Sequence, residues 1–115
     1  MIAKKPTIMI YTARPDASLL REICAGIEEE GVLFEVVSAL AGDATVLAAA
    51  ASDASVLGSG VALCGTTVAL HIKGMERGRT VLQYENATPQ KARDVGANSA
   101  RVIKKLPFKL EENQV

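Results

Sequence analysis

Aromatic side chains are scarce in this sequence of 115 residues, and tryptophan is absent. Two tyrosines and two phenylalanines are the whole aromatic complement, although 49% of the residues are hydrophobic. An apolar core therefore has to be filled with valine, leucine, isoleucine and alanine. A chain of this length can build one such core but not two, so we expect a single domain over residues 1–115.

An excess of charge of one sign is also lacking, because 13 basic side chains are balanced by 13 acidic ones. Nucleic-acid binders need a concentrated lysine and arginine surface, so this balance argues against one. Arg101, Lys104 and Lys105 do cluster, but so few charges are more typical of a solvated helix face. The apolar stretch near residue 10 is too short for a signal core or a membrane span. We expect a cytoplasmic protein with no nucleic-acid or membrane partner.

Groups that carry covalent or metal chemistry are equally few. Cys24 and Cys64 lie in apolar runs without C-x-x-C spacing, which argues against a disulfide framework and favours a reducing compartment. His71 is the one histidine, and it has no His, Cys or carboxylate at ligand spacing. No Ser/His/Asp or Cys/His arrangement can be assembled, so the sequence predicts no catalytic residues and no self-contained enzyme.

Hydrophobic periodicity predicts alternating strands and helices. Apolar runs predict strands at 7–12, 32–39 and 80–85. Helices are predicted from a cap at Asp16 or Ser18 to Gly31, over 42–54, and from Thr88 to Pro107. On the last of these helices, small residues such as Gly96 share one face, which predicts a close approach to the sheet.

A hairpin is predicted between the second and third helices. Two Val-Ala-Leu stretches flank "CGTT", and Gly65-Thr66 suits the two corners of a II′ turn joining strands at 60–64 and 67–73. The predicted fold class is therefore α/β, with three layers and a five-stranded mixed sheet in which one strand of the hairpin 60–73 is antiparallel.

Three adjacent carboxylates, Glu28, Glu29 and Glu30, precede Gly31 at the expected end of the first helix. Negative charge is unfavourable there, because the last carbonyls of a helix carry partial negative charge. A helical wheel directs Glu29 away from the core. The run is either a solvated helix end or a site for a cation, a metal ion or a basic partner surface. A hard ion such as Mg²⁺ would need ligands from a second chain, because one helix cannot complete its coordination shell.

Two further polar stretches leave alternatives open. The "GSG" at 58–60 resembles part of a phosphate-binding loop, but it precedes a strand rather than a helix. Asn98 and Arg101 lie on the expected outer face of the last helix, three residues apart. They are candidates for capping a loop, for meeting a partner, or simply for solvation.

Four segments together resemble a known family: "LLREICAGIEEEGV" at 19–32, "GSGVAL" at 58–63, "LHIKGM" at 70–75 and "ARDVGANSARVIKKLPF" at 92–108. This family holds the small subunit of the glycerol/diol dehydratase reactivating factor and the medium subunit of the cobalamin-dependent dehydratase. The resemblance covers most of residues 7–108. Its most specific part is the combination of "GIEEEG" with the helix motif GxNxAR.

The resemblance implies a three-layer domain of the anticodon-binding-domain-like type that has no catalytic activity of its own. It implies a small subunit whose ATPase-like large partner carries the nucleotide. Such a subunit takes the place of the dehydratase medium subunit on the dehydratase large subunit, so that damaged cobalamin leaves. The expected setting is a cytoplasmic hetero-oligomer in diol or glycerol metabolism, with a bacterial microcompartment as an alternative location.

For the carboxylate run, the resemblance implies that Glu29 lies near a metal ion at the boundary with the large subunit. The implied ion is a Mg²⁺ shared with that subunit, and no cofactor is expected on this chain alone. The expected partner interface comprises Glu28, Glu29, Glu30, Asn98 and Arg101.

Two alternatives remain. One is a minimal dehydratase medium subunit that contacts cobalamin, and the other is a doubly wound nucleotide binder using "GSG". A medium subunit would be expected to carry extensions at both ends. Here we expect an ordered core at about 6–108 and a frayed tail at 109–115, which favours the reactivase small subunit.

Overall fold

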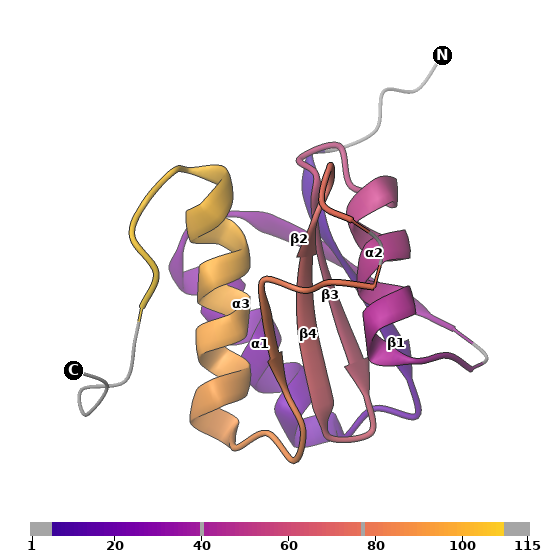
Figure 1. The fold of residues 1–115 in the computed structure, drawn as a ribbon. Coiled ribbons are helices and arrows are strands. Elements are labelled where there is room, and N and C mark those ends of the chain that lie inside the picture. Colours follow the sequence, from indigo (N-terminus) through magenta and orange to yellow (C-terminus); the bar gives the residue numbers. More distant parts are fainter. Residues whose placement is uncertain (1–5, 40, 77, 110–115) are drawn as a thin grey trace.

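The computed structural model describes residues 6–39, 41–76 and 78–109, which form a three-layer α/β domain (Figure 1). The bounds of its elements are β1 Thr7–Ala13, α1 Ala17–Glu29, β2 Leu33–Ser38, α2 Ala44–Ala54, β3 Ser59–Cys64, β4 Thr67–Ile72, β5 Leu82–Tyr84 and α3 Pro89–Ile103. None of the described helices has the length and apolar composition that a membrane span requires.

The five strands form one mixed sheet in the order β2-β1-β3-β4-β5. β1 pairs in parallel with β2 and with β3, whereas β4 is antiparallel to both β3 and β5. The hairpin between β3 and β4 has a two-residue loop, and Gly65 has a φ of 60°, the left-handed value that the first corner of a II′ turn requires. The predicted fold class, including one antiparallel strand in the hairpin, is confirmed.

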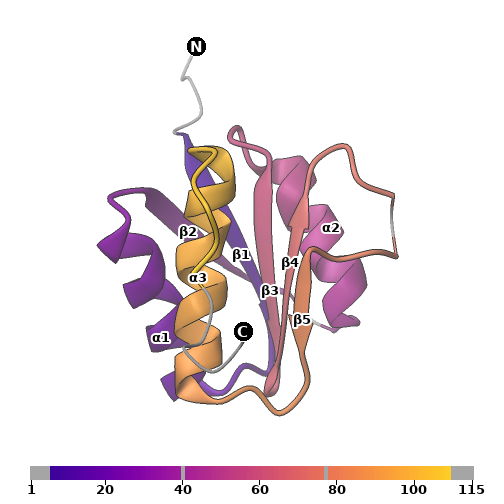
Figure 2. The same ribbon diagram turned by 60° about the vertical axis from the view of Figure 1, so that its left-hand side comes forward.

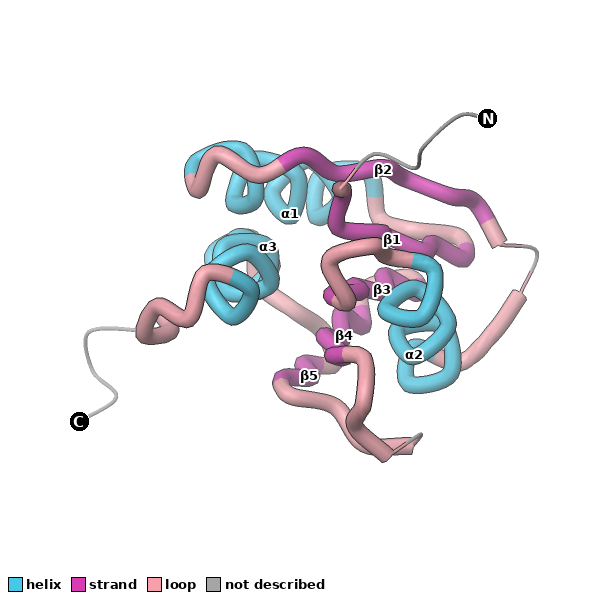
Figure 3. Tube along the Cα trace, turned by 90° about the horizontal axis from the view of Figure 1, so that it is seen from above, coloured by secondary structure: helices cyan, strands magenta, loops and turns pink. Residues whose placement is uncertain are grey.

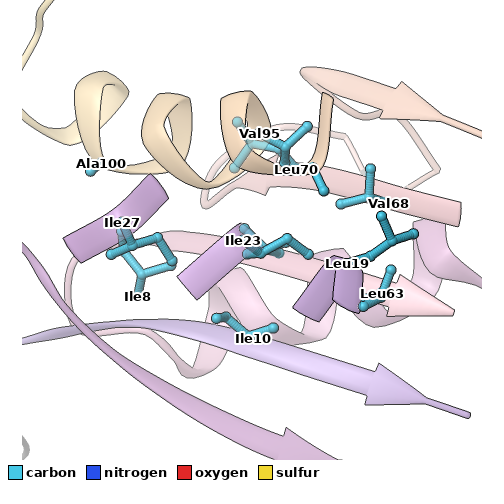
Figure 4. Close-up of a cluster of buried hydrophobic side chains, with 12 residues drawn as sticks. Ile8, Ile10, Leu19, Ile23, Ile27, Leu63, Val68, Leu70, Val95 and Ala100 are labelled. Atoms are coloured by element: carbon cyan, nitrogen blue, oxygen red, sulfur yellow. The ribbon is translucent and has the colours of Figure 1, made fainter. Parts of the chain in front are cut away.

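The helices cover the two faces of the sheet unequally. Figures 2 and 3 show α1 and α3 side by side on one face and α2 on the other. The larger core lies under the helix pair, where Ile23 and Ile27 of α1 lie between α3 and the strands (Figure 4). The α2 face is lined by small residues, among them Ala48, Ala62 and Ala69. The sparse aromatic content therefore reflects a core of branched aliphatics on one face and alanine on the other.

Glycines set the close contacts between neighbouring elements. A Cβ on Gly96 would lie 2.2 Å from the carbonyl oxygen of Ile23, and one on Gly26 would lie 2.2 Å from that of Arg93. α1 and α3 therefore touch backbone to backbone. The expected close approach of the Gly96 face to the sheet is wrong for this residue, because its neighbour is α1. A Cβ on Gly60 would lie 2.1 Å from the backbone nitrogen of Ser52, so this glycine seats α2 on β3.

The helix ends follow the predicted caps, with one difference. Asp16 is the N-cap of α1 and accepts from the Leu19 N–H at 3.0 Å, while the Ser18 hydroxyl donates to the same carboxylate. These hydrogen bonds, led by that of Ser18, hold the pKa of Asp16 below its ordinary value. The last helix ends at Ile103 rather than near Pro107. The chain turns there because Lys105 takes a left-handed φ of 59°.

The last strand is also shorter than predicted. β5 comprises three residues, Leu82–Tyr84, instead of 80–85. The preceding Val81 N–H donates to the Leu70 carbonyl at 2.8 Å, but Thr80 donates through its side chain to Gln83. The pairing with β4 therefore covers only Leu82–Tyr84, and β5 is a short edge strand.

Candidate interaction site

Two of the predicted carboxylates, Glu29 and Glu30, meet cations of the last helix along one ridge, where α1 and α3 lie side by side (Figure 2). We call this the α1–α3 ridge and define it by six charged residues: Glu22, Glu29, Glu30, Arg93, Arg101 and Lys104. Ion pairs across the two helices include all six, in two sets: Arg93 with Glu22 and Glu29, and Glu30 with Arg101 and Lys104. The charges of the ridge therefore pair with one another across the two helices and are not separately solvated.

Glu30 is the structural member of the carboxylate run. It is the C-cap of α1, and its side chain is only 9% exposed. Its carboxylate accepts from the Nε of Arg101 at 3.1 Å and lies 3.8 Å from the Nζ of Lys104. Lys104 also donates to the backbone carbonyl of Glu30. Two cations from α3 thus offset the unfavourable negative charge at the end of α1.

Glu29 is the accessible member of the run. It is the last residue of α1, and its side chain is 45% exposed, in keeping with the helical wheel. It nevertheless has a cation beside it, because its Oε1 accepts from the Nε of Arg93 at 3.1 Å. The Nη1 of the same arginine lies 3.3 Å from the Oε1 of Glu22. Glu28 is exposed and completes the run.

Asn98 and Arg101 hold the segment that follows α3. Asn98 was expected on the outer face, but it is 2% exposed. Its amide nitrogen donates to the carbonyl of Lys109 at 3.1 Å, and its amide oxygen accepts from the Lys109 N–H at 2.7 Å. Arg101 donates from Nη1 to the Pro107 carbonyl at 3.0 Å. Of the three alternatives open to this pair, the structure shows loop capping.

The C-terminal segment, residues 105–109, therefore doubles back beside α3 (Figure 1). A frayed tail was expected from residue 109 onward. Lys109 makes both hydrogen bonds to Asn98, and the rest of that tail, residues 110–115, lies outside the described residues.

Sequence reasoning missed the partners of the carboxylates. Lys104 was interpreted as part of a solvated helix face and Arg93 was not singled out, because nothing near either residue in sequence pairs with it. Their partners lie more than 60 residues away, since Arg93 to Glu29 spans 64 positions. Opposite charges on the polar sides of two amphipathic helices were the available signal. Their match depends on how the helices align, which the two glycines of the contact set.

A pocket of about 430 Å³ lies at the carboxyl ends of β1 and β3, lined by Ala13, Arg14, Ala41, Gly42, Cys64 and Gly65. This is the edge at which open α/β sheets bind ligands. The "GSG" stretch is at the other end of β3, so it does not contribute to this pocket. Burial, together with the carboxylate of Asp43, raises the pKa of the Cys64 thiol. That thiol is therefore a poor nucleophile at neutral pH.

His71 serves the packing of α2 on the sheet. It is 2% exposed, its Nδ1 lies 2.7 Å from the hydroxyl of Ser52, and its Nε2 lies 3.4 Å from the carbonyl of Glu76. Both ring nitrogens thus face protein groups inside the domain. This environment fits a structural role for His71.

Ser52→Ala is expected to destabilise the domain by about 1 to 3 kcal/mol, because it leaves a buried imidazole nitrogen without a partner. Urea unfolding would measure this loss. Ser38→Ala, at an exposed serine on β2, is the matched control and should change stability by less than about 0.5 kcal/mol. Equal effects of the two substitutions would contradict the role assigned to the Ser52–His71 contact.

Metal binding by this chain alone finds no support in its described residues. Within 6–39, 41–76 and 78–109, no three His, Cys, Asp or Glu side chains gather where they could hold an ion. Glu29 presents an exposed carboxylate, which is the oxygen ligand that Mg²⁺ prefers, but only as one ligand of a larger set. A metal ion at Glu29 would need further ligands that the described residues do not supply.

Fold and site together define a small three-layer α/β domain with a charged ridge formed by two neighbouring helices. The chain belongs to the dehydratase medium subunit family, whose model matches residues 5–109.

Two curated relatives match nearly the whole chain. The propanediol dehydratase-reactivating factor small subunit of Salmonella typhimurium LT2 is 33% identical over 107 residues, covering 90% of each protein. The diol dehydratase-reactivating factor small subunit of Klebsiella michiganensis is 31% identical over 107 residues, covering 90% of this chain and 84% of the relative.

Solved structures agree with these relatives. A chain of the diol dehydratase-reactivating factor complexed with ADP and Mg²⁺ is 30% identical and superposes with a TM-score of 0.86, covering 93% of this chain and 100% of that one. A chain of a glycerol dehydratase reactivase is 26% identical with a TM-score of 0.86, covering 92% and 98%. The fold is thus shared with reactivase structures over almost its full length.

Proposed function

We propose that this chain is the non-catalytic small subunit of a reactivating factor for a cobalamin-dependent diol or glycerol dehydratase. The observation that carries the proposal is its similarity to two reactivating-factor small subunits, at 33% and 31% identity over 90% of its length. The match in fold to a reactivating factor supports the same assignment. Its partners would be an ATPase-like large subunit and the dehydratase large subunit, in the cytoplasm or in a bacterial microcompartment.

The proposed mechanism is an exchange of subunits. The family takes its description from the dehydratase medium subunit, yet the curated relatives are reactivating-factor small subunits. A shared fold lets one protein occupy the place of the other on a common partner. Exchange of the small subunit for the medium subunit would loosen the dehydratase and release damaged cobalamin. ATP hydrolysis would belong to the large subunit.

Glu29 is the residue we assign to the boundary with the large subunit. Its carboxylate is 45% exposed on the α1–α3 ridge, so a cation can approach it. A related reactivating factor was solved with Mg²⁺, and we propose that the same ion is shared here between Glu29 and ligands of the large subunit. The ion would hold the Glu29 carboxylate and the ligands of the large subunit together electrostatically. Glu28, Glu30, Asn98 and Arg101 would shape the surrounding surface.

The alternative is a minimal dehydratase medium subunit, favoured by the description of the family whose model matches residues 5–109. Copurification from the native host separates the two assignments. A medium subunit should bring a cobamide and a catalytic chain, whereas a reactivase small subunit should bring an ATPase-like chain. Restoration of activity to an inactivated dehydratase, by this chain with its large subunit, ATP and fresh coenzyme, would support the proposal. If the dehydratase stays inactive although the large subunit hydrolyses ATP, that result would count against the proposal.

Glu29→Gln is expected to weaken binding of the large subunit by about 1 to 2 kcal/mol, because a charge-assisted contact loses its charge. The stability of the free chain should change by less than about 0.5 kcal/mol, since an exposed ion pair is lost and the repulsion at the helix end is relieved. Calorimetric titration with Mg²⁺ present measures the first quantity, and urea unfolding measures the second.

Glu28→Gln is the matched control for Glu29→Gln, because it removes an adjacent exposed charge. It should weaken binding by less than Glu29→Gln does, because Glu28 would shape the surface without contacting the proposed ion. If Glu29→Gln destabilises the free chain and leaves the affinity intact, Glu29 is a structural residue and its boundary role is wrong.

A further inference from the structure

Arg93 contacts two carboxylates of α1 through different nitrogens. Its Nε donates to Glu29 at 3.1 Å, and its Nη1 lies 3.3 Å from Glu22. The side chains of Glu22, Glu29 and Arg93 are 32%, 45% and 39% exposed, so all three are within reach of solvent and of ions. One guanidinium is therefore shared between two accessible carboxylates.

The backbone fixes this arrangement. The carbonyl of Arg93 lies against Gly26, where a Cβ would come within 2.2 Å. Glu22 and Glu29 are four residues before and three residues after that glycine, on the same side of α1. The guanidinium is thus held between two carboxylates. If it leaves Glu29, it still has Glu22 beside it, so the arginine keeps an anionic partner.

We propose that Arg93 is an internal counter-ion that competes with an incoming divalent cation for Glu29, and that Glu22 holds Arg93 once Glu29 is taken. This inference rests on the proposed function, which places Glu29 at the boundary with the large subunit. In the free chain Arg93 keeps the exposed carboxylate neutralised. The chain's own residues then set how much Mg²⁺ is needed before the boundary forms.

Glu30 shows why the exchange is assigned to its neighbour. Its side chain is only 9% exposed, and two cations of α3 approach it. An ion could not reach it without displacing both Arg101 and Lys104. Among the described residues, Glu29 pairs with one cation, Arg93, and Arg93 also pairs with a second carboxylate, Glu22.

The test measures the Mg²⁺ concentration that half-saturates binding of the chain to its large subunit. Arg93→Met keeps the apolar stem of the side chain and removes the competing charge. It should lower this concentration about two- to fivefold, the range that corresponds to an exposed ion pair. Glu22→Gln removes the second site for Arg93 and should raise the concentration by a similar factor.

General electrostatics alone would produce shifts of the same signs, so the double variant decides. If Glu22 acts through Arg93, then Glu22→Gln has no further effect in the Arg93→Met background. Additive effects in the double variant would overturn the proposal. So would a Glu22→Gln effect no larger than that of Glu28→Gln, which removes an equally negative exposed charge on α1.

Failure of this inference is distinguishable from failure of the proposed function. If Glu29→Gln leaves the Mg²⁺ dependence unchanged, the boundary role of Glu29 and the counter-ion exchange are both wrong, whereas the reactivase assignment itself is decided by the restoration of dehydratase activity. If Glu29→Gln removes the Mg²⁺ dependence while the Arg93 and Glu22 variants act additively or not at all, only the counter-ion exchange is wrong. Thermal unfolding of each free variant verifies that it folds. If Arg93→Met does not fold, Arg93→Lys replaces it, and its half-saturating Mg²⁺ concentration is expected to lie between those of wild type and Arg93→Met.

Discussion

Gly96→Ala is expected to destabilise the domain by about 3 kcal/mol, the upper part of the range for inserting a methyl group into a packed interior. The added Cβ would lie 2.2 Å from the carbonyl oxygen of Ile23 and 3.1 Å from its Cα. Both are backbone atoms of α1, so no side chain can turn aside. The two helices would have to separate over the larger core, which would weaken the packing of Ile23 and Val95.

Denaturant unfolding measures this effect, and Gly31→Ala provides the control. Gly31 has a φ of 74° and open space around its Cα, so alanine there meets only backbone strain, of about 1 kcal/mol. A loss for Gly96→Ala no larger than that for Gly31→Ala would show that α1 and α3 can move apart freely. The account of the helix contact would then be wrong.

Local patterns predicted the fold because each acts within a few residues. The corner at Gly65, the caps at Asp16 and Thr88, and the alternation of apolar runs all depend on neighbouring backbone atoms. These local features determined the hairpin and hence the antiparallel strand. The sequence therefore predicted the order and type of every element. The ends of β5 and α3 were not predicted, because they depend on the pairing of β5 with β4 and on the turn of the chain after α3, which hydrophobic periodicity does not determine.

The candidate site was predictable only in part, because its main contacts cross between helices. A helical wheel shows which residues share a face, but not which element that face meets. The wheel therefore directed Gly96 toward the sheet, whereas the structure places it against α1. Likewise, Asn98 lies on the polar side of α3 and becomes buried because the C-terminal segment covers it. The pairing of Arg93 with its two carboxylates was missed for the same reason, because they lie on a different helix.

The carboxylate run combines two roles that its sequence cannot separate. Glu29 and Glu30 are adjacent and chemically identical, yet one side chain is 45% exposed and the other 9%. The difference arises where α1 ends, since Glu29 is the last helical residue and Glu30 is the cap whose side chain turns toward α3. We therefore expect substitutions at the two positions to separate binding from stability.

Glu30→Ala is expected to destabilise the free chain by about 2 to 3 kcal/mol. Breaking a buried ion pair costs about 3 to 5 kcal/mol, and the partial exposure of Arg101 and Lys104, 25% and 38%, reduces the loss. The substitution leaves two cations facing one another without their shared carboxylate. Urea unfolding measures the loss, and Glu28→Ala, at an exposed position of the same helix end, should change stability by less than about 0.5 kcal/mol.

A second measurement tests the effect of Glu30→Ala on the C-terminal segment. Arg101 links the Glu30 carboxylate to the Pro107 carbonyl, so loss of the carboxylate should free the arginine and loosen residues 105–109. The Lys109 amide, which donates to Asn98 at 2.7 Å, should then exchange its hydrogen faster in Glu30→Ala than in Glu28→Ala. Equal exchange in the two variants, together with equal stability, would mean that Glu30 is as dispensable as its exposed neighbour and that the ridge does not hold the segment in place.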